Sequence, residues 1–123
     1  MDLFKTNKKL KNLSKKDFDG KKIKKIHNEG LLLVYASWCG YCIQLKPIWN
    51  SLSKVKGKVQ MFIINEADNK ELIKELGVVS YPSIFKVSKN GSLTPYKGNR
   101  DIMSLVNLLC NIDKKNKICS TKK

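Results

Sequence analysis

Two cysteines three positions apart, Cys39 and Cys42, are the residues of this 123-residue chain best suited to chemistry. An apolar run over residues 31–35 precedes them, and a pattern with one apolar face follows over residues 42–52. The run predicts a buried strand and the pattern predicts a helix. The pair is therefore expected where a strand passes into a helix, with Cys39 just before the first turn and Cys42 one turn along.

This position gives the two thiols different reactivities. The unpaired N–H groups and the positive dipole end of a first helical turn stabilise a thiolate at Cys39, which makes it the attacking sulfur. Cys42 is expected on the same side of the turn, where it can attack a mixed disulfide formed at Cys39. Gly40 is predicted to let the backbone bend tightly, and the Trp38 ring to screen one side of the sulfur. The pattern predicts dithiol–disulfide exchange.

Two other uses of a C-x-x-C pair fit this chain less well. A structural zinc needs four ligands, and only His27, Cys110 and Cys119 remain to complete a set, without a second closely spaced pair. A structural bond between Cys39 and Cys42 would close too short a loop to stabilise the fold much. We therefore expect redox chemistry that needs no metal and no organic cofactor.

The other two cysteines lie near the C-terminus. Cys110 ends an apolar helix face and is predicted to be a buried thiol. Cys119 follows in a basic tail, and three states remain open for it: a free thiol, a bond to Cys110, or a link between two chains.

The chain is strongly basic, with 25 Lys and Arg against 10 Asp and Glu and a formal net charge of +15. Such a charge favours acidic surfaces, including nucleic acid. However, no aromatic residues interleave with the lysines to stack bases, and no nucleic-acid motif is present. We interpret the lysines as a solvated surface that reflects a bias towards Lys, Ile and Asn, and expect no nucleic-acid partner.

Length and composition predict one globular domain that acts as a monomer. No stretch could span a bilayer, and the first residues lack the apolar region of a secretory leader. These observations predict a cytoplasmic location, which suits a catalytic cysteine pair and argues against structural disulfides. The Lys, Ile and Asn bias would also fit a large DNA virus, and packaging into its particle is then a further hypothesis.

Hydrophobic periodicity and turn signals predict an order of elements. We expect flexible residues 1–9, a domain over residues 10–111 and a basic flexible tail over residues 112–123. The domain should contain an edge strand at 10–13, strands at 31–35, 59–64, 83–87 and 93–97, and helices at 14–27, 39–55, 69–76 and 101–111. This order predicts an α/β fold with a mixed central sheet, helices on both faces and a C-terminal β-hairpin.

Over about residues 10–111 the chain resembles the thioredoxin superfamily, and within it the catalytic domains of protein disulfide isomerases. The stretch 38–42, Trp-Cys-Gly-Tyr-Cys, matches the active-site pattern W-C-G-x-C of that family. Pro47 matches the proline inside the active-site helix, and Tyr81-Pro82 matches the family's cis-proline and the residue before it. The resemblance implies a thioredoxin-like three-layer α/β/α fold and a protein disulfide oxidoreductase or isomerase.

The same resemblance implies roles for individual residues. Cys39 and Cys42 would form the redox-active disulfide, and Arg100 would move towards Cys42 and favour its thiolate. Substrate would bind across the remaining motif residues, which are Trp38, Gly40, Tyr41, Tyr81 and Pro82. The implied partners are proteins that carry disulfides or dithiols, and a reductase or oxidase that recycles the pair.

Three positions depart from the family pattern. Leu33 stands where the family usually has a buried acid behind the second cysteine, and Ile63 stands where a lysine often partners that acid. Tyr41 replaces the proline or histidine found before the second cysteine. Cys42 is therefore expected to lack its usual proton acceptor. A redox-inert interaction module with the same fold is the alternative function.

Overall fold

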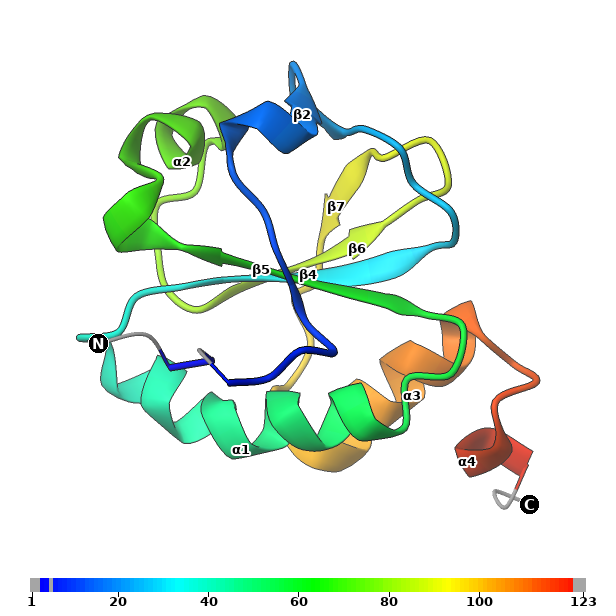
Figure 1. Ribbon diagram of the computed structural model, residues 1–123. Helices are drawn as coiled ribbons and strands as arrows, with labels where there is room; N and C mark the ends of the chain where they lie inside the picture. The colour runs from blue at the N-terminus through cyan, green and yellow to red at the C-terminus, as the bar shows by residue number, and fades with distance from the viewer. Residues whose placement is uncertain (1–2, 5, 121–123) are drawn as a thin grey trace.

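The computed structural model describes residues 3–4 and 6–120, which fold around a five-stranded sheet (Figure 1). The sheet has the spatial order β1, β5, β4, β6, β7. Strands β1 (Lys11–Asn12), β5 (Gln60–Asn65) and β4 (Gly30–Tyr35) run parallel to one another. Strand β6 (Ser83–Val87) pairs antiparallel with β4, and β7 (Leu93–Pro95) pairs antiparallel with β6. The predicted mixed sheet that ends in a hairpin is confirmed.

Alternate residues of the central strand β4 face opposite sides of the sheet, as the pleat requires. Leu31, Leu33 and Tyr35 pack in the core under α1 (Gly40–Lys54) and α3 (Ile102–Ile112). Leu32 and Val34 pack in a second core under α2 (Lys70–Leu76). Figure 1 shows α1 and α3 on one side of the sheet and α2 on the other, which is the predicted three-layer arrangement.

The prediction of a helix over residues 14–27 is wrong. The Asp17 carboxylate does accept the Ser14 N–H at 2.9 Å, but the turn it starts is only a 3-10 helix, η1 (Lys15–Asp17). Gly20 and Lys25 adopt positive φ, which ends any helical run. The chain forms a small antiparallel ribbon instead, from β2 (Phe18–Asp19) and β3 (Lys22–Ile23). His27, expected at a helix end, lies exposed in the loop before β4.

A close backbone contact explains why this ribbon is favoured. Phe18 and Ile23 are register partners, and both side chains are buried on the α2 side of the sheet. The Ile23 N–H donates to the Gly91 carbonyl at 3.0 Å. Gly91 has φ of +89°, and a Cβ there would lie 2.1 Å from the Ile23 carbonyl oxygen. The Asn90-Gly91 turn therefore joins β6 to β7 and also packs closely against the β2–β3 ribbon.

The ends of the chain also differ from expectation. Of the ends expected to be flexible, residues 1–2, 5 and 121–123 lie outside the described residues. Within the described part, Phe4 is buried against Tyr35 and the Asn7 amide donates to Asn50 and Ser53. The expected flexible tail contains α4 (Lys117–Ser120), and a disulfide joins Cys110 to Cys119. The intramolecular bond decides among the three states left open for Cys119. It also contradicts the prediction that Cys110 is a buried thiol.

Candidate dithiol active site

The two cysteines of the motif lie at the start of α1. Cys39 is the N-cap residue, with extended backbone angles, and its carbonyl accepts the first helical hydrogen bond from Ile43 N–H at 3.1 Å. Cys39 and Cys42 are both free thiols, and their exposed fractions are 8% and 1%. The Cys39 side chain makes no capping hydrogen bond to the N–H groups of the first turn. The strand-to-helix placement predicted for the pair is confirmed.

The inner thiol resists ionisation. Burial raises the pKa of Cys42 to about 11, and the neighbouring Cys39 thiol adds to this effect. A backbone contact with Ala36 and the positive charge of Arg100 lower the pKa, but by less than burial raises it. Cys42 is thus held neutral over the physiological range and needs help to lose its proton.

A backbone carbonyl lies beside the outer thiol. The Cys39 thiol donates to the Tyr81 carbonyl oxygen, with an Sγ–O distance of 3.4 Å. The Tyr81–Pro82 peptide bond is cis, as the resemblance implies, and it brings the loop before β6 against the start of α1. The fold therefore brings Tyr81 and Pro82 next to Cys39, from which they are more than 40 positions away in the sequence.

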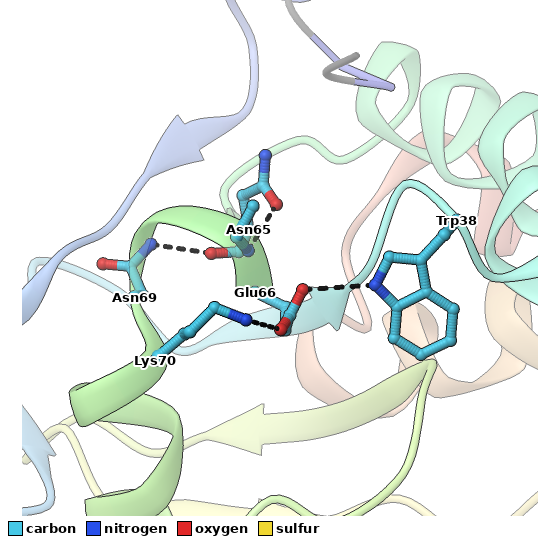
Figure 2. A network of polar contacts seen from close by, with 6 residues as sticks. Trp38, Asn65, Glu66, Asn69 and Lys70 are labelled. Carbon is cyan, nitrogen blue, oxygen red and sulfur yellow. Dashed lines mark hydrogen bonds and ion pairs between the residues drawn. The ribbon is translucent and has the colours of Figure 1, made fainter.

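The exposed Trp38 ring is fixed by a polar network that Figure 2 shows from close by. Its indole N–H donates to Glu66 Oε1 at 3.3 Å, and Glu66 Oε2 is 2.8 Å from the Lys70 ammonium. The hydrogen-bonded Lys70 holds the pKa of Glu66 below its usual value, so the carboxylate stays charged. Trp38 also meets the Tyr81 ring edge to face, with 5.8 Å between centroids.

Sequence reasoning missed Glu66. Its side chain is only 14% exposed and lies in η2 (Glu66–Asp68), directly after β5. The Asn65 side chain caps this turn by accepting the Ala67 N–H at 3.1 Å. Since β5 runs parallel to β4, the residues after both strands meet at one edge of the sheet. The sequence signal that could have found Glu66 is an acidic residue immediately after β5, the strand parallel to β4.

Arg100 lies beside Tyr41, the residue before the second cysteine of the motif. The guanidinium carbon of Arg100 is 5.7 Å from the centroid of the Tyr41 ring, which is within the range of a cation–π contact. Both side chains are exposed. Arg100 and Pro82 also line a surface groove of about 500 Å³, with the exposed Val79 among its other lining residues.

Gly40 does not act as expected. Its φ lies outside the positive range, and a Cβ at this position would meet no atom within 4 Å. Neither the backbone angles nor a close neighbour therefore requires a glycine at this position. The missing side chain leaves open space beside Cys39 instead.

No group of three or more His, Cys, Asp and Glu side chains among residues 3–4 and 6–120 is arranged to hold a metal ion. Nor does any helix within that part have the length and apolar character needed to cross a bilayer.

Fold and site together define a thioredoxin-type domain with a dithiol at the start of its first long helix. The sequence profile of the thioredoxin family matches residues 9–111, and the chain belongs to that family. Several curated relatives are named as protein disulfide isomerases. Protein disulfide isomerase-like 2-3 of Oryza sativa subsp. japonica is 34% identical over 88 residues, which are 69% of this chain and 20% of that protein. Protein disulfide-isomerase A6 of Mus musculus is 31% identical over 77 residues, 58% of this chain and 18% of that protein.

Solved structures agree on the fold. The J-Trx1 fragment of ERdj5 matches with a TM-score of 0.75 and 25% identity, over 89% of this chain and 54% of that fragment. The first thioredoxin domain of mouse protein disulfide-isomerase A4 matches with a TM-score of 0.67 and 24% identity, over 86% of this chain and 74% of that domain. The chain thus spans about a fifth of the curated relatives' length, 20% and 18% for the two named above.

Proposed function

We propose that this protein is a thiol–disulfide oxidoreductase that acts on protein disulfides through Cys39 and Cys42. The observation that carries the proposal is the position of Cys39, at the N-cap of α1 and hydrogen-bonded to the Tyr81 carbonyl. A helix N-terminus favours the thiolate that attacks a substrate disulfide. The named relatives, protein disulfide isomerases that match at the level of one domain, support the same chemistry.

The reaction proceeds in two exchanges. The Cys39 thiolate attacks one sulfur of the substrate disulfide, the other substrate sulfur leaves as a thiolate, and a mixed disulfide forms. Cys42 then loses its proton and attacks Cys39 Sγ, which releases the second substrate thiolate and leaves a Cys39–Cys42 disulfide. A dithiol reductant returns the pair to its starting state. Run in reverse, the same steps oxidise a substrate dithiol, and an oxidase then recycles the pair.

The surroundings of the dithiol suit an extended polypeptide. The Tyr81–Pro82 segment precedes β6 and leaves backbone groups beside Cys39, where a substrate strand can pair. The rings of Trp38 and Tyr41, both within the motif, are exposed and offer apolar contacts to a substrate. Arg100, near Tyr41, favours the Cys42 thiolate by its charge without accepting the proton.

Reduction of insulin by dithiothreitol tests the proposal. The full chain is expected to accelerate the reaction, and Cys39→Ser to abolish the acceleration. Cys42→Ala, which avoids placing a hydroxyl in a buried position, is expected to accumulate mixed disulfides that excess reductant releases. The Cys110→Ser/Cys119→Ser variant controls for the second cysteine pair and should keep the activity. A full chain that leaves the uncatalysed rate unchanged contradicts the proposal and favours a redox-inert binding module.

A further inference from the structure

The second cysteine pair ties down a segment that follows the matched thioredoxin residues. The Cys110–Cys119 bond joins the last turn of α3 to α4, with 5.7 Å between the Cα atoms. It encloses the residues between them, most of which lie beyond residue 111, where the family match ends. Figure 1 shows α4 near the C-terminal end of α1, whereas Cys39 caps the N-terminal end. The length of α1 therefore separates α4 from Cys39 by about 20 Å.

Specific contacts seat this segment on the loop after α1. The Asn116 side chain, which is 8% exposed, donates to the Val55 carbonyl at 2.7 Å. The Asp113 carboxylate accepts the Lys58 N–H at 3.3 Å. Gly57 has φ of +57°, and a Cβ there would lie 2.7 Å from the Asn116 amide nitrogen and 2.9 Å from the Asp113 carboxylate. The loop is therefore shaped for close approach of the segment.

Most charges at the same contact are positive. A cleft of about 890 Å³ lies between the loop and the segment, and exposed lysines line it from both sides. Lys54 and Lys58 come from the α1 end and its loop, and Lys115 comes from the segment. Asp113 is the one acidic residue among the cleft's described lining residues. Like charges gathered at one cleft disfavour the contact, and solvent screens this repulsion at exposed side chains. The covalent bond and the hydrogen bonds together hold the segment against it.

We propose that Cys110 and Cys119 form a second redox site, a reversible disulfide that small thiols of the glutathione class reduce, and that its reduction releases residues 113–120 from the loop at 55–58. Both cysteines are half-buried, so an attacking thiolate can reach the bond. The released state is favoured by the repulsion across the cleft, and the bonded state by the short covalent loop. Such an element has two arrangements, and the redox state of the pair selects between them.

The reduction balances as two thiol exchanges. A thiolate attacks one sulfur of the Cys110–Cys119 bond, the bond breaks, and the other cysteine leaves as a thiolate that takes up a proton. A second small thiol then attacks the mixed disulfide and frees the remaining cysteine. Two thiols supply two electrons and two protons, and they leave joined as a small-molecule disulfide.

Amide hydrogen exchange across a redox titration tests this proposal. The full chain carrying Cys39→Ser/Cys42→Ala is equilibrated in glutathione buffers of increasing reducing power, so that only the second pair titrates. Mass spectrometry after alkylation gives its state. On reduction, the amides of Asn116 and Cys119, which are hydrogen-bonded within the segment, should exchange about tenfold faster or more, while β4 amides keep their protection.

A matched variant separates the bond from its contacts. Cys110→Ser/Cys119→Ser should show the fast segment exchange under all conditions, with β4 still protected. A pair that stays oxidised in excess dithiothreitol while the chain is folded overturns the proposal. So does a pair that is reduced without any change in segment exchange, and so does reduction that exposes β4 and the segment together. None of these readouts uses the Cys39–Cys42 reaction, so the outcome is independent of the proposed function.

Discussion

Leu33 of β4 and Ile63 of β5 are register partners in the parallel pair behind the dithiol, and both are fully or almost fully buried. They belong to the same apolar core as Cys42. The resemblance to the thioredoxin superfamily places a buried acid and its lysine at these two positions. Two apolar side chains there supply no proton acceptor, so the proton of Cys42 must leave by another route.

The pH dependence of substrate release should show this. Burial raises the pKa of Cys42 to about 11, so the thiol is neutral at lower pH and the reactive thiolate increases as pH rises. Release of the mixed disulfide is therefore expected to accelerate about tenfold per pH unit between about pH 7 and pH 10, without a plateau. Stopped-flow measurement with a fluorescent peptide disulfide gives the rate. A plateau well below pH 9 would contradict the expectation and point to a proton acceptor near Cys42.

Arg100→Ala should slow release more than attack. The guanidinium favours the Cys42 thiolate from its place near Tyr41, and Cys42 acts in the release step. Removing one exposed charge should slow release about two- to tenfold. Arg100→Lys should restore part of the rate, because a compact ammonium cannot lie on the Tyr41 ring as a planar guanidinium does.

Lys97→Ala provides the matched control for this charge. Lys97 lies close in sequence to Arg100 and shares the groove beside Pro82, but its charge is not among the causes that shift the pKa of Cys42. Its removal should leave both steps nearly unchanged. Equal slowing of attack and release in Arg100→Ala would show that the residue has a general structural role instead.

Glu66→Ala should release the Trp38 ring. The Glu66 carboxylate is the hydrogen-bond acceptor of the indole N–H, and Lys70 holds it in its charged form. Loss of one such hydrogen bond should raise the KM for a peptide disulfide about two- to fivefold with little change in kcat. Glu66→Gln keeps an acceptor and should stay close to the parent.

Fluorescence anisotropy of Trp38 checks the cause. Trp49→Phe removes the only other tryptophan of the sequence. Because the buried indole nitrogen of Trp49 has no hydrogen-bond partner, the substitution breaks no hydrogen bond. In that background the Trp38 signal should show faster local motion in Glu66→Ala and not in Glu66→Gln. Unchanged motion in both variants would mean that the Tyr81 ring alone holds Trp38 in place.

The parts of this fold that the sequence predicted correctly depend on local signals. A strand of consecutive apolar residues at 31–35 and a strand ending at the Asn90-Gly91 turn have few alternatives. The dithiol was predictable for the same reason, since Cys39 and Cys42 lie within one turn of each other. The cis bond at Pro82 followed from the resemblance and not from the residues around it.

The parts that were missed depend on contacts between distant residues. Ser14 and Asp17 do start a helical turn, but Gly91, about 70 positions later, offers Ile23 a hydrogen bond that a helix could not make. In the same way the basic tail shows no apolar pattern, and it is held by Val55 and by the bond from Cys110. Tertiary contacts decided both segments over local preference.

Leu33→Glu introduces a buried carboxyl group at the position where relatives usually carry one. A carboxyl group at this fully buried position should cost about 1–3 kcal/mol of unfolding free energy even if it stays neutral. Burial raises the pKa of such a group, whereas the unfolded chain ionises it above about pH 4. The unfolding free energy should therefore fall further as pH rises from there, since ionisation favours the unfolded state. Urea unfolding at several pH values measures both effects.

Leu32→Glu separates the burial of a carboxyl group from its position. Leu32 is as buried as Leu33 but lies in the core under α2, on the other face of the sheet from Cys42. Both variants should lose stability, and only Leu33→Glu places a proton acceptor in the core that contains Cys42. Its release rate should then depend less steeply on pH than that of the parent, while Leu32→Glu keeps the parent's slope. Identical slopes in all three proteins would show that the apolar pair at Leu33 and Ile63 does not control proton loss from Cys42.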